Sequence, residues 1–130
     1  MNRHNARIGL VRCIYALDFN PGISQMSSVL DDLKLDTKAF DYIENSIYDI
    51  KSKLAEIDEM IKPHLNKWTI DRLTKVDLAI LRVAVYELKF CDDIPAGASI
   101  NEAVDIAKEY STEASGKYVN GVLSSVLKSL

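Results

Sequence analysis

The segment VDLAILRVAVYELKF, from Val76 to Phe90, decides how this chain folds. Apolar residues occupy nearly its whole circumference, which at this length indicates an α-helix enclosed by other helices. The segment is too short to span a bilayer. Thr74 and Asp77 resemble a capping box, in which the hydroxyl satisfies a free amide and the carboxylate meets the positive helix end. A central helix is therefore predicted to begin near Lys75.

The few polar side chains of this helix are predicted to lie on the surface. Lys75, Arg82 and Lys89 recur every seven residues and form one narrow stripe, which we interpret as solvent-exposed. Asp77 and Glu87 are expected elsewhere on the surface.

A first helix is predicted from Asn5 to Asp18, because its apolar residues follow helical spacing. Arg3 and Arg7 extend the same side beyond the apolar patch, so we expect guanidinium groups that reach past the packed core. The Asn-Pro-Gly sequence at 20–22 ends this helix, since proline lacks an amide hydrogen and glycine tolerates a left-handed turn.

Two more helices are predicted before the central one. Ser24 is a candidate cap for a short helix, and Asp36 for a long one. In the long helix the apolar residues alternate steps of three and four: Phe40, Ile43, Ile47, Ile50, Leu54, Ile57 and Ile61. Such a seam needs a partner helix, and the other apolar helices of the chain favour an internal bundle over a coiled-coil dimer. Pro63 marks its end, and one helical turn is expected within residues 68–73.

The last third of the chain is also helical in pattern. A loop is predicted from Cys91 to Ala98, and Ser99 with Glu102 is interpreted as a second capping box. Residues 111–115 interrupt that helix, and the final helix contains Gly121, interpreted as a close packing point. The prediction is an all-α fold with a single domain over residues 1–130.

Charge is distributed unevenly along the chain. Arg3, Arg7 and Arg12 give the first twelve residues +3, whereas the rest carries 13 bases and 19 acids, or −6. This asymmetry suggests a polyanion contact at one end of an acidic body, although solvated arginines at a chain start are common. With no signal-peptide core and no long apolar segment, the chain is predicted to be cytoplasmic.

No constellation of residues predicts catalysis, a metal or a cofactor. Cys13 and Cys91 lack C-x-x-C spacing and are interpreted as buried thiols in a reducing cytosol. His4 and His64 are sixty residues apart without metal-ligand spacing, and no phosphate-binding glycine loop occurs. The chain is therefore expected not to be an enzyme.

Three segments of the chain carry recognisable motifs: WTIDRLTKVDLAILRVAVYELKF starts at Trp68, IPAGASINEAVDIAKEYSTEASGKYVNGVL starts at Ile94, and AR(x)3V(x)3Y runs from Ala6 to Tyr15. These segments resemble the NusB family of bacterial transcription antitermination factors. The ordered combination of ILR-x-A-x-YE, INEAV-x-x-AK and KYVNG is specific, whereas each motif alone is weak.

The resemblance implies about seven helices arranged as two small sub-bundles. It also implies binding to boxA RNA and to the ribosomal protein NusE within an RNA polymerase antitermination complex. The residues that match RNA-contacting positions are Arg3, Arg7, Tyr15, His64, Lys117 and Tyr118. Cations for phosphates and rings for unstacked bases suit single-stranded RNA. Asp77 matches an acidic position near the NusE contact, where a negative residue suits a basic partner.

Each residue also has an ordinary interpretation. The two arginines could solubilise a frayed terminus, Tyr15 and Tyr118 could be packed rings, and His64 could be structural. Asp77 could only complement the dipole of the central helix. Two other functions stay open: an RNA-binding domain of a ribosomal RNA methyltransferase, and a helical interaction module, with a homodimer through the seam at 40–61.

Overall fold

The computed structural model describes residues 2–20 and 29–130, and within these ranges it contains helices but no strand. The described α-helices are α1 (Arg3–Phe19), α3 (Thr37–Ser52), α4 (Leu54–Ile61), α5 (Lys75–Phe90), α6 (Ala96–Tyr110) and α7 (Glu113–Ser129). The short 3-10 helices are η1 (Asp31–Leu33), η2 (Lys62–His64) and η3 (Ile70–Arg72). The all-α prediction is confirmed, while the predicted cap at Ser24 lies outside the described residues.

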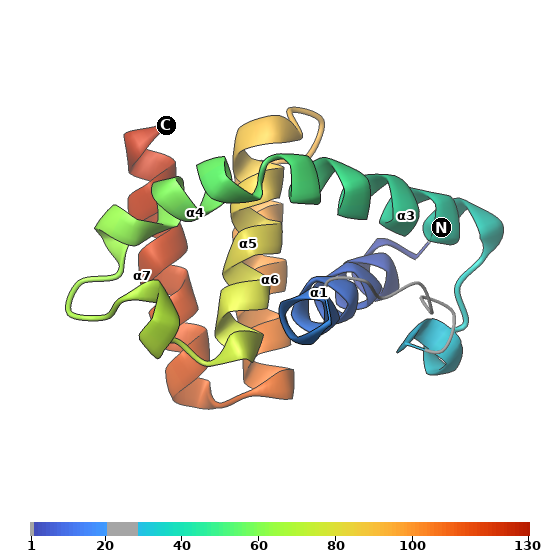
Figure 1. The fold of residues 1–130 in the computed structure, drawn as a ribbon, viewed down its shortest axis with the longest axis horizontal. Coiled ribbons are helices and arrows are strands. Elements are labelled where there is room, and N and C mark those ends of the chain that lie inside the picture. Colours follow the sequence, from blue (N-terminus) through green and yellow to red (C-terminus); the bar gives the residue numbers. More distant parts are fainter. Residues whose placement is uncertain (1, 21–28) are drawn as a thin grey trace.

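Helix α5 is the centre of the fold. It contacts α1, α4, α6 and α7, and Figure 1 shows these helices grouped around it. Every residue from Asp77 to Glu87 is buried. The helix starts at Lys75, where the Thr74 hydroxyl accepts a hydrogen bond from the Asp77 amide at 3.1 Å. The enclosed central helix and its cap are therefore confirmed.

The described helices pack in two groups that share α5. Helix α1 packs on α3 and α5, whereas α6 packs on α7 and both contact α5. Figure 1 shows α3 and α4 running across one end of α5, with the turn between α6 and α7 at the other end. None of the helices within the described ranges is long and apolar enough to cross a membrane.

The polar stripe predicted on α5 is wrong at Arg82, which is only 7% exposed. Its Nη1 donates to Asp18 Oδ1 at 2.9 Å, and its Nε and Nη2 donate to the Asp58 carboxylate, each at 2.9 Å. Burial lowers the pKa of Arg82, but the hydrogen bonds to Asp58 and Asp18 outweigh this effect and raise it. Lys75 and Lys89 are exposed as expected.

The single long helix predicted after Asp36 is divided in two. The Asp36 cap is confirmed, since its Oδ1 accepts from the Ala39 amide at 2.8 Å. Helix α3 ends at Ser52, and Lys53, with φ −113° and ψ 8°, separates it from α4. The break lets the apolar seam face α1 along α3 and face α5 along α4.

The seam is buried inside the chain. Four of its isoleucines are 0% exposed: Ile43, Ile50, Ile57 and Ile61. The internal bundle is confirmed, because the chain's own helices cover these four side chains. The alternative of a homodimer through this seam stays a prediction.

The capping box predicted at Ser99 and Glu102 is wrong, because α6 begins earlier, at Ala96. The Ser99 hydroxyl instead donates to Glu87 Oε1 at 2.7 Å, inside the core. Glu102 lies 2.6 Å from His4 Nδ1. Both side chains of the apparent motif are therefore used in contacts with other helices.

The close packing predicted at Gly121 is also wrong. Gly121 lies in α7, but a Cβ built there would meet no atom within 4 Å. The crowded glycine of α7 is Gly116, where a Cβ would lie 2.7 Å from Lys108 Cγ on α6.

Candidate nucleic-acid interface

Three of the predicted RNA-contacting residues lie together on η2 and α7. Tyr118 donates from its hydroxyl to the Leu65 carbonyl at 3.2 Å, which joins α7 to the segment after η2. His64 Nδ1 lies 2.7 Å from the Ser125 hydroxyl of α7. Lys117 is exposed and directly precedes Tyr118 on α7. The structure therefore places the imidazole and the phenol where η2 meets α7, and an exposed cation next to the phenol in the chain.

Tyr118 is partly exposed and held by its hydroxyl. Burial raises the pKa of Tyr118, and the nearby negative charge of Asp77 raises it further. The phenol therefore stays protonated and keeps its hydrogen bond to Leu65. The ring also packs against the hydrophobic core, so the alternative of a packing role for Tyr118 stays open.

Asp77 is 7% exposed, so the expectation of a surface carboxylate is wrong. Its Oδ2 accepts a hydrogen bond from the Ser115 hydroxyl at 3.2 Å, and its Oδ1 is buried without a hydrogen-bond partner in the described part of the chain. Ser115 also contacts the Ser111 hydroxyl at 2.9 Å. Asp77 thus ties the first turn of α5 to the turn between α6 and α7.

Tyr15 lies in the last part of α1 and is 38% exposed. Asp18, one turn further, has Oδ2 4.0 Å from Lys75 Nζ at the start of α5. With 38% of its surface exposed, Tyr15 is an accessible ring, and the alternative of a core ring does not apply.

The two predicted arginines, Arg3 and Arg7, do not lie near Tyr15 at the end of α1. Arg3 is exposed but lies at the start of α1, about 18 Å from Tyr15 at the helical rise of 1.5 Å per residue. Arg7 is 8% exposed, so the prediction that it reaches past the core is wrong. The six predicted residues therefore do not form one continuous rim.

Arg7 is buried because its charge is compensated inside the protein. Its Nε donates to both oxygens of Glu87, at 3.0 and 2.9 Å, and Glu87 is 1% exposed. Burial lowers the pKa of Arg7, but the hydrogen bond and charge of Glu87 outweigh this effect and raise it. Arg7 thereby positions α1 against α5.

Three accessible residues near Tyr15 were not among the predicted RNA contacts, although Arg12 was counted in the basic end of the chain. Arg12 and Phe19 lie on the same helix, and Tyr110 ends α6. The spacing of residues 12, 15 and 19 indicates a common helical face, a signal that the sequence already contains. Only the tertiary structure brings Tyr110 to this face.

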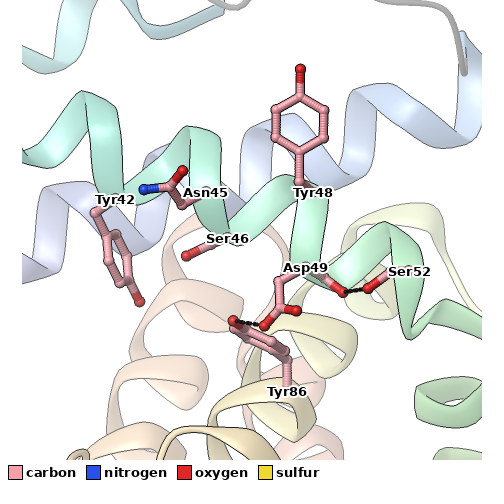
Figure 2. Close-up of a pocket in the computed structure, with 7 residues that line it drawn as sticks. All are labelled: Tyr42, Asn45, Ser46, Tyr48, Asp49, Ser52 and Tyr86. Carbon is pink, nitrogen blue, oxygen red and sulfur yellow. Dashed lines mark hydrogen bonds between the residues drawn. The ribbon is translucent and has the colours of Figure 1, made fainter.

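A separate surface cavity of about 500 Å³, wide open to solvent, lies on α3 and α5 (Figure 2). Its lining residues are Tyr42, Asn45, Ser46, Tyr48, Asp49, Ser52 and Tyr86. The Tyr86 hydroxyl donates to Asp49 Oδ2 at 2.7 Å, and Lys53 pairs with the other oxygen. Figure 2 shows Tyr48 pointing away from this pair. No residue predicted to bind RNA lines this cavity.

No group of three or more potential metal ligands occurs among the residues that the structure describes. The two histidines are engaged separately, His4 with Glu102 and His64 with Ser125. The fold and surface define a small all-α protein with accessible rings on α1, η2 and α7 and an exposed cation on α7.

A model of the NusB family matches residues 4–128, and the chain belongs to this family. A transcription antitermination protein NusB from Listeria monocytogenes is 39% identical over 126 residues, which cover 97% of this chain and 96% of the relative.

Two solved structures agree with the same fold. NusB from T. maritima matches with a TM-score of 0.86 and 37% identity, over 98% of this chain and 92% of that one. A NusB solved with NusE and double-stranded RNA matches with a TM-score of 0.82 and 28% identity, over the whole of both chains.

Proposed function

We propose that this chain is a cytoplasmic, non-catalytic transcription antitermination factor that binds boxA-type RNA together with NusE and joins an RNA polymerase antitermination complex. The observation that carries the proposal is the nearly full-length match to transcription antitermination proteins. The relative solved with NusE and double-stranded RNA, which matches over its whole length, supports NusE and an RNA as partners.

The relative's own length favours this function over an enzyme's RNA-binding domain. The Listeria protein is covered over 96% of its length, which leaves it no room for a fused methyltransferase domain.

The RNA contacts are assigned to the accessible residues. Lys117 supplies a cation for a phosphate, and the rings of Tyr15, His64 and Tyr118 supply faces for unstacked bases. Arg3 is assigned a separate phosphate contact at the far end of α1. Arg7 and Asp77 are too buried to touch a strand.

The NusE contact is assigned to the acidic body of the chain. Residues 13–130 carry a net charge of −6, which is complementary to a basic ribosomal protein. Buried Asp77 contributes indirectly, because its bond to Ser115 shapes the turn between α6 and α7.

The test is a titration of boxA-type RNA with the chain alone and with NusE at several salt concentrations. Lys117→Ala and Arg3→Ala should each lower the affinity and reduce the slope of log K against log salt by about 0.7, the value for one phosphate contact to a single strand. Lys89→Ala, an exposed cation in the last turn of α5, is the matched control. Absence of RNA binding even with NusE present would refute the proposal.

A further inference from the structure

Three side chains of α1 form one accessible stripe. Arg12, Tyr15 and Phe19 are spaced i, i+3 and i+7, so they lie on the same face of the helix. Phe19 is 61% exposed, and its ring centre lies 5.0 Å from that of Tyr15 at an interplanar angle of 58°. Two large rings are thus in contact with each other and open to solvent.

Arg12 continues the stripe onto α6. Its guanidinium carbon lies 5.7 Å from the ring centre of Tyr110, and its Nη2 donates to the Tyr110 hydroxyl at 3.0 Å. Tyr110 is itself 41% exposed. A flat guanidinium and a third ring therefore extend the surface made by Tyr15 and Phe19.

The charge of Arg12 is balanced within the chain. Its Nη1 and Nη2 donate to the two Asp32 oxygens at 2.6 and 3.2 Å. This two-point contact fixes the plane of the guanidinium and offsets its charge. Arg12 is thereby suited to present a flat face rather than to hold a phosphate.

This surface includes Tyr15, which is already assigned to RNA. Tyr110 is the last residue of α6, and the hydroxyls of Ser111 and Ser115 lie 2.9 Å apart in the segment that follows. A strand that contacts Tyr15 can therefore also reach Phe19 and, through Arg12, Tyr110.

The side chains of the stripe indicate which kind of ligand it binds. Contiguous exposed rings are costly in water and mark binding surfaces. Nucleobases stack on aromatic rings and on guanidinium planes whatever their sequence, and unpaired strands offer such faces freely. Residues 12 to 19 span roughly 10 Å along the helix, which exceeds the width of one base face.

We propose that Arg12, Tyr15, Phe19 and Tyr110 form a preassembled stacking platform for unpaired bases of a bound single strand. The platform rests on the proposed RNA-binding function and adds Arg12, Phe19 and Tyr110 to its contact residues. Its contribution is stacking, so it is insensitive to salt.

The experiment measures affinity for boxA-type RNA with the NusE-bound chain and compares wild type with Phe19→Ala and Tyr110→Ala. Each variant should bind about 5- to 150-fold more weakly, as expected for the loss of one base–ring stack, with an unchanged salt slope. Tyr110→Phe keeps the ring and should bind nearly as wild type. Tyr48→Ala, a 69% exposed tyrosine of α3, is the matched control and should have no effect.

RNAs with one abasic nucleotide at each position separate stacking from a structural effect. An abasic position that weakens wild type but no longer weakens Tyr110→Ala identifies the stacked base. Equal affinity of wild type and both alanine variants would overturn the platform while leaving the proposed function intact. If an alanine variant no longer bound NusE in the absence of RNA, the rings would be assigned to the protein partner. That result would also overturn the platform. If the wild-type chain bound no RNA in the presence of NusE, both the platform and the proposed RNA-binding function would be refuted.

Discussion

Arg7 on α1 donates from Nε to both carboxylate oxygens of Glu87 on α5, at 3.0 and 2.9 Å, in a part of the core where Glu87 is 1% exposed. This buried pair joins helices that are 80 residues apart in sequence. Ser99 adds a hydrogen bond from α6 to the same carboxylate. The pair therefore fixes α1 against both α5 and α6.

Glu87→Leu should lower the free energy of unfolding by about 3–5 kcal/mol, because it removes the hydrogen-bonded partner of the buried Arg7 charge and leaves only Glu102, with its Oε1 3.9 Å from Nη1. The double variant Arg7→Met/Glu87→Leu should recover most of this loss, since two apolar side chains can fill the same space. Urea unfolding of the single and double variants measures both effects. Arg3→Ala is the control, and a double variant no more stable than Glu87→Leu would contradict the prediction.

Arg82→Met should destabilise the fold by about 3–5 kcal/mol, because Asp58 loses its hydrogen-bonded cation and Asp18 keeps only Lys75, 4.0 Å away. Lys89→Met, one heptad further along α5 and exposed, should change stability by less than about 0.5 kcal/mol. Equal effects of the two substitutions in urea unfolding would show that Arg82 is not a buried ion-pair partner.

Gly121→Ala should stabilise the chain by about 0.5–1 kcal/mol, because it removes backbone freedom in the middle of α7 and meets no neighbouring atom. Gly9→Ala should be destabilising, since its Cβ would lie 2.8 Å from Ile43 Cδ1 in the core. Thermal unfolding should give a higher melting temperature for Gly121→Ala and a lower one for Gly9→Ala. A lower melting temperature for Gly121→Ala would contradict the open environment of this position.

Cys13 should resist alkylation in the folded chain. Burial raises the pKa of its thiol to about 11, which leaves on the order of one thiolate in a thousand at pH 8. Burial also raises the pKa of Cys91, but this side chain is partly accessible and should react first. Mass spectrometry after timed iodoacetamide treatment measures which of the two cysteines is alkylated first. Denaturant should make the two rates similar, and faster labelling of Cys13 in the native state would contradict the burial.

Acid should weaken the contact between Asp49 and its partners. Hydrogen bonds from Lys53 and Tyr86 lower the pKa of Asp49 below its ordinary value of 3.8. A lowered folded-state pKa gives stability that is present above pH 4 and is lost as pH falls through the folded value. Asp49→Asn should therefore reduce the dependence of stability on pH below 4, and an unchanged dependence would contradict the assignment.

Local patterns predicted most of the helices. The caps at Thr74 and Asp36 and the turn within residues 68–73 were found from side-chain chemistry, because a cap depends only on residues three positions apart. Local pattern failed where a polar residue had two possible partners. Ser99 resembles a cap in sequence but donates to Glu87 in the structure.

The candidate site was only partly predictable. Lys117 and Tyr118 were found because they lie in a motif that resembles a known family. Tyr110 was not found in this way, because its neighbour in the fold, Arg12, is 98 residues away in sequence. A contact of this kind has no local period and no spacing rule.

The sequence by itself determined that the chain is helical and that α5 is central, because apolar periodicity and caps are properties of neighbouring residues. The tertiary structure alone decided which charges are buried. Burying a guanidinium is costly unless a carboxylate lies within hydrogen-bonding distance. For Arg7 and Arg82 those carboxylates come from other helices, so only packing could determine that these arginines stabilise the core instead of facing solvent.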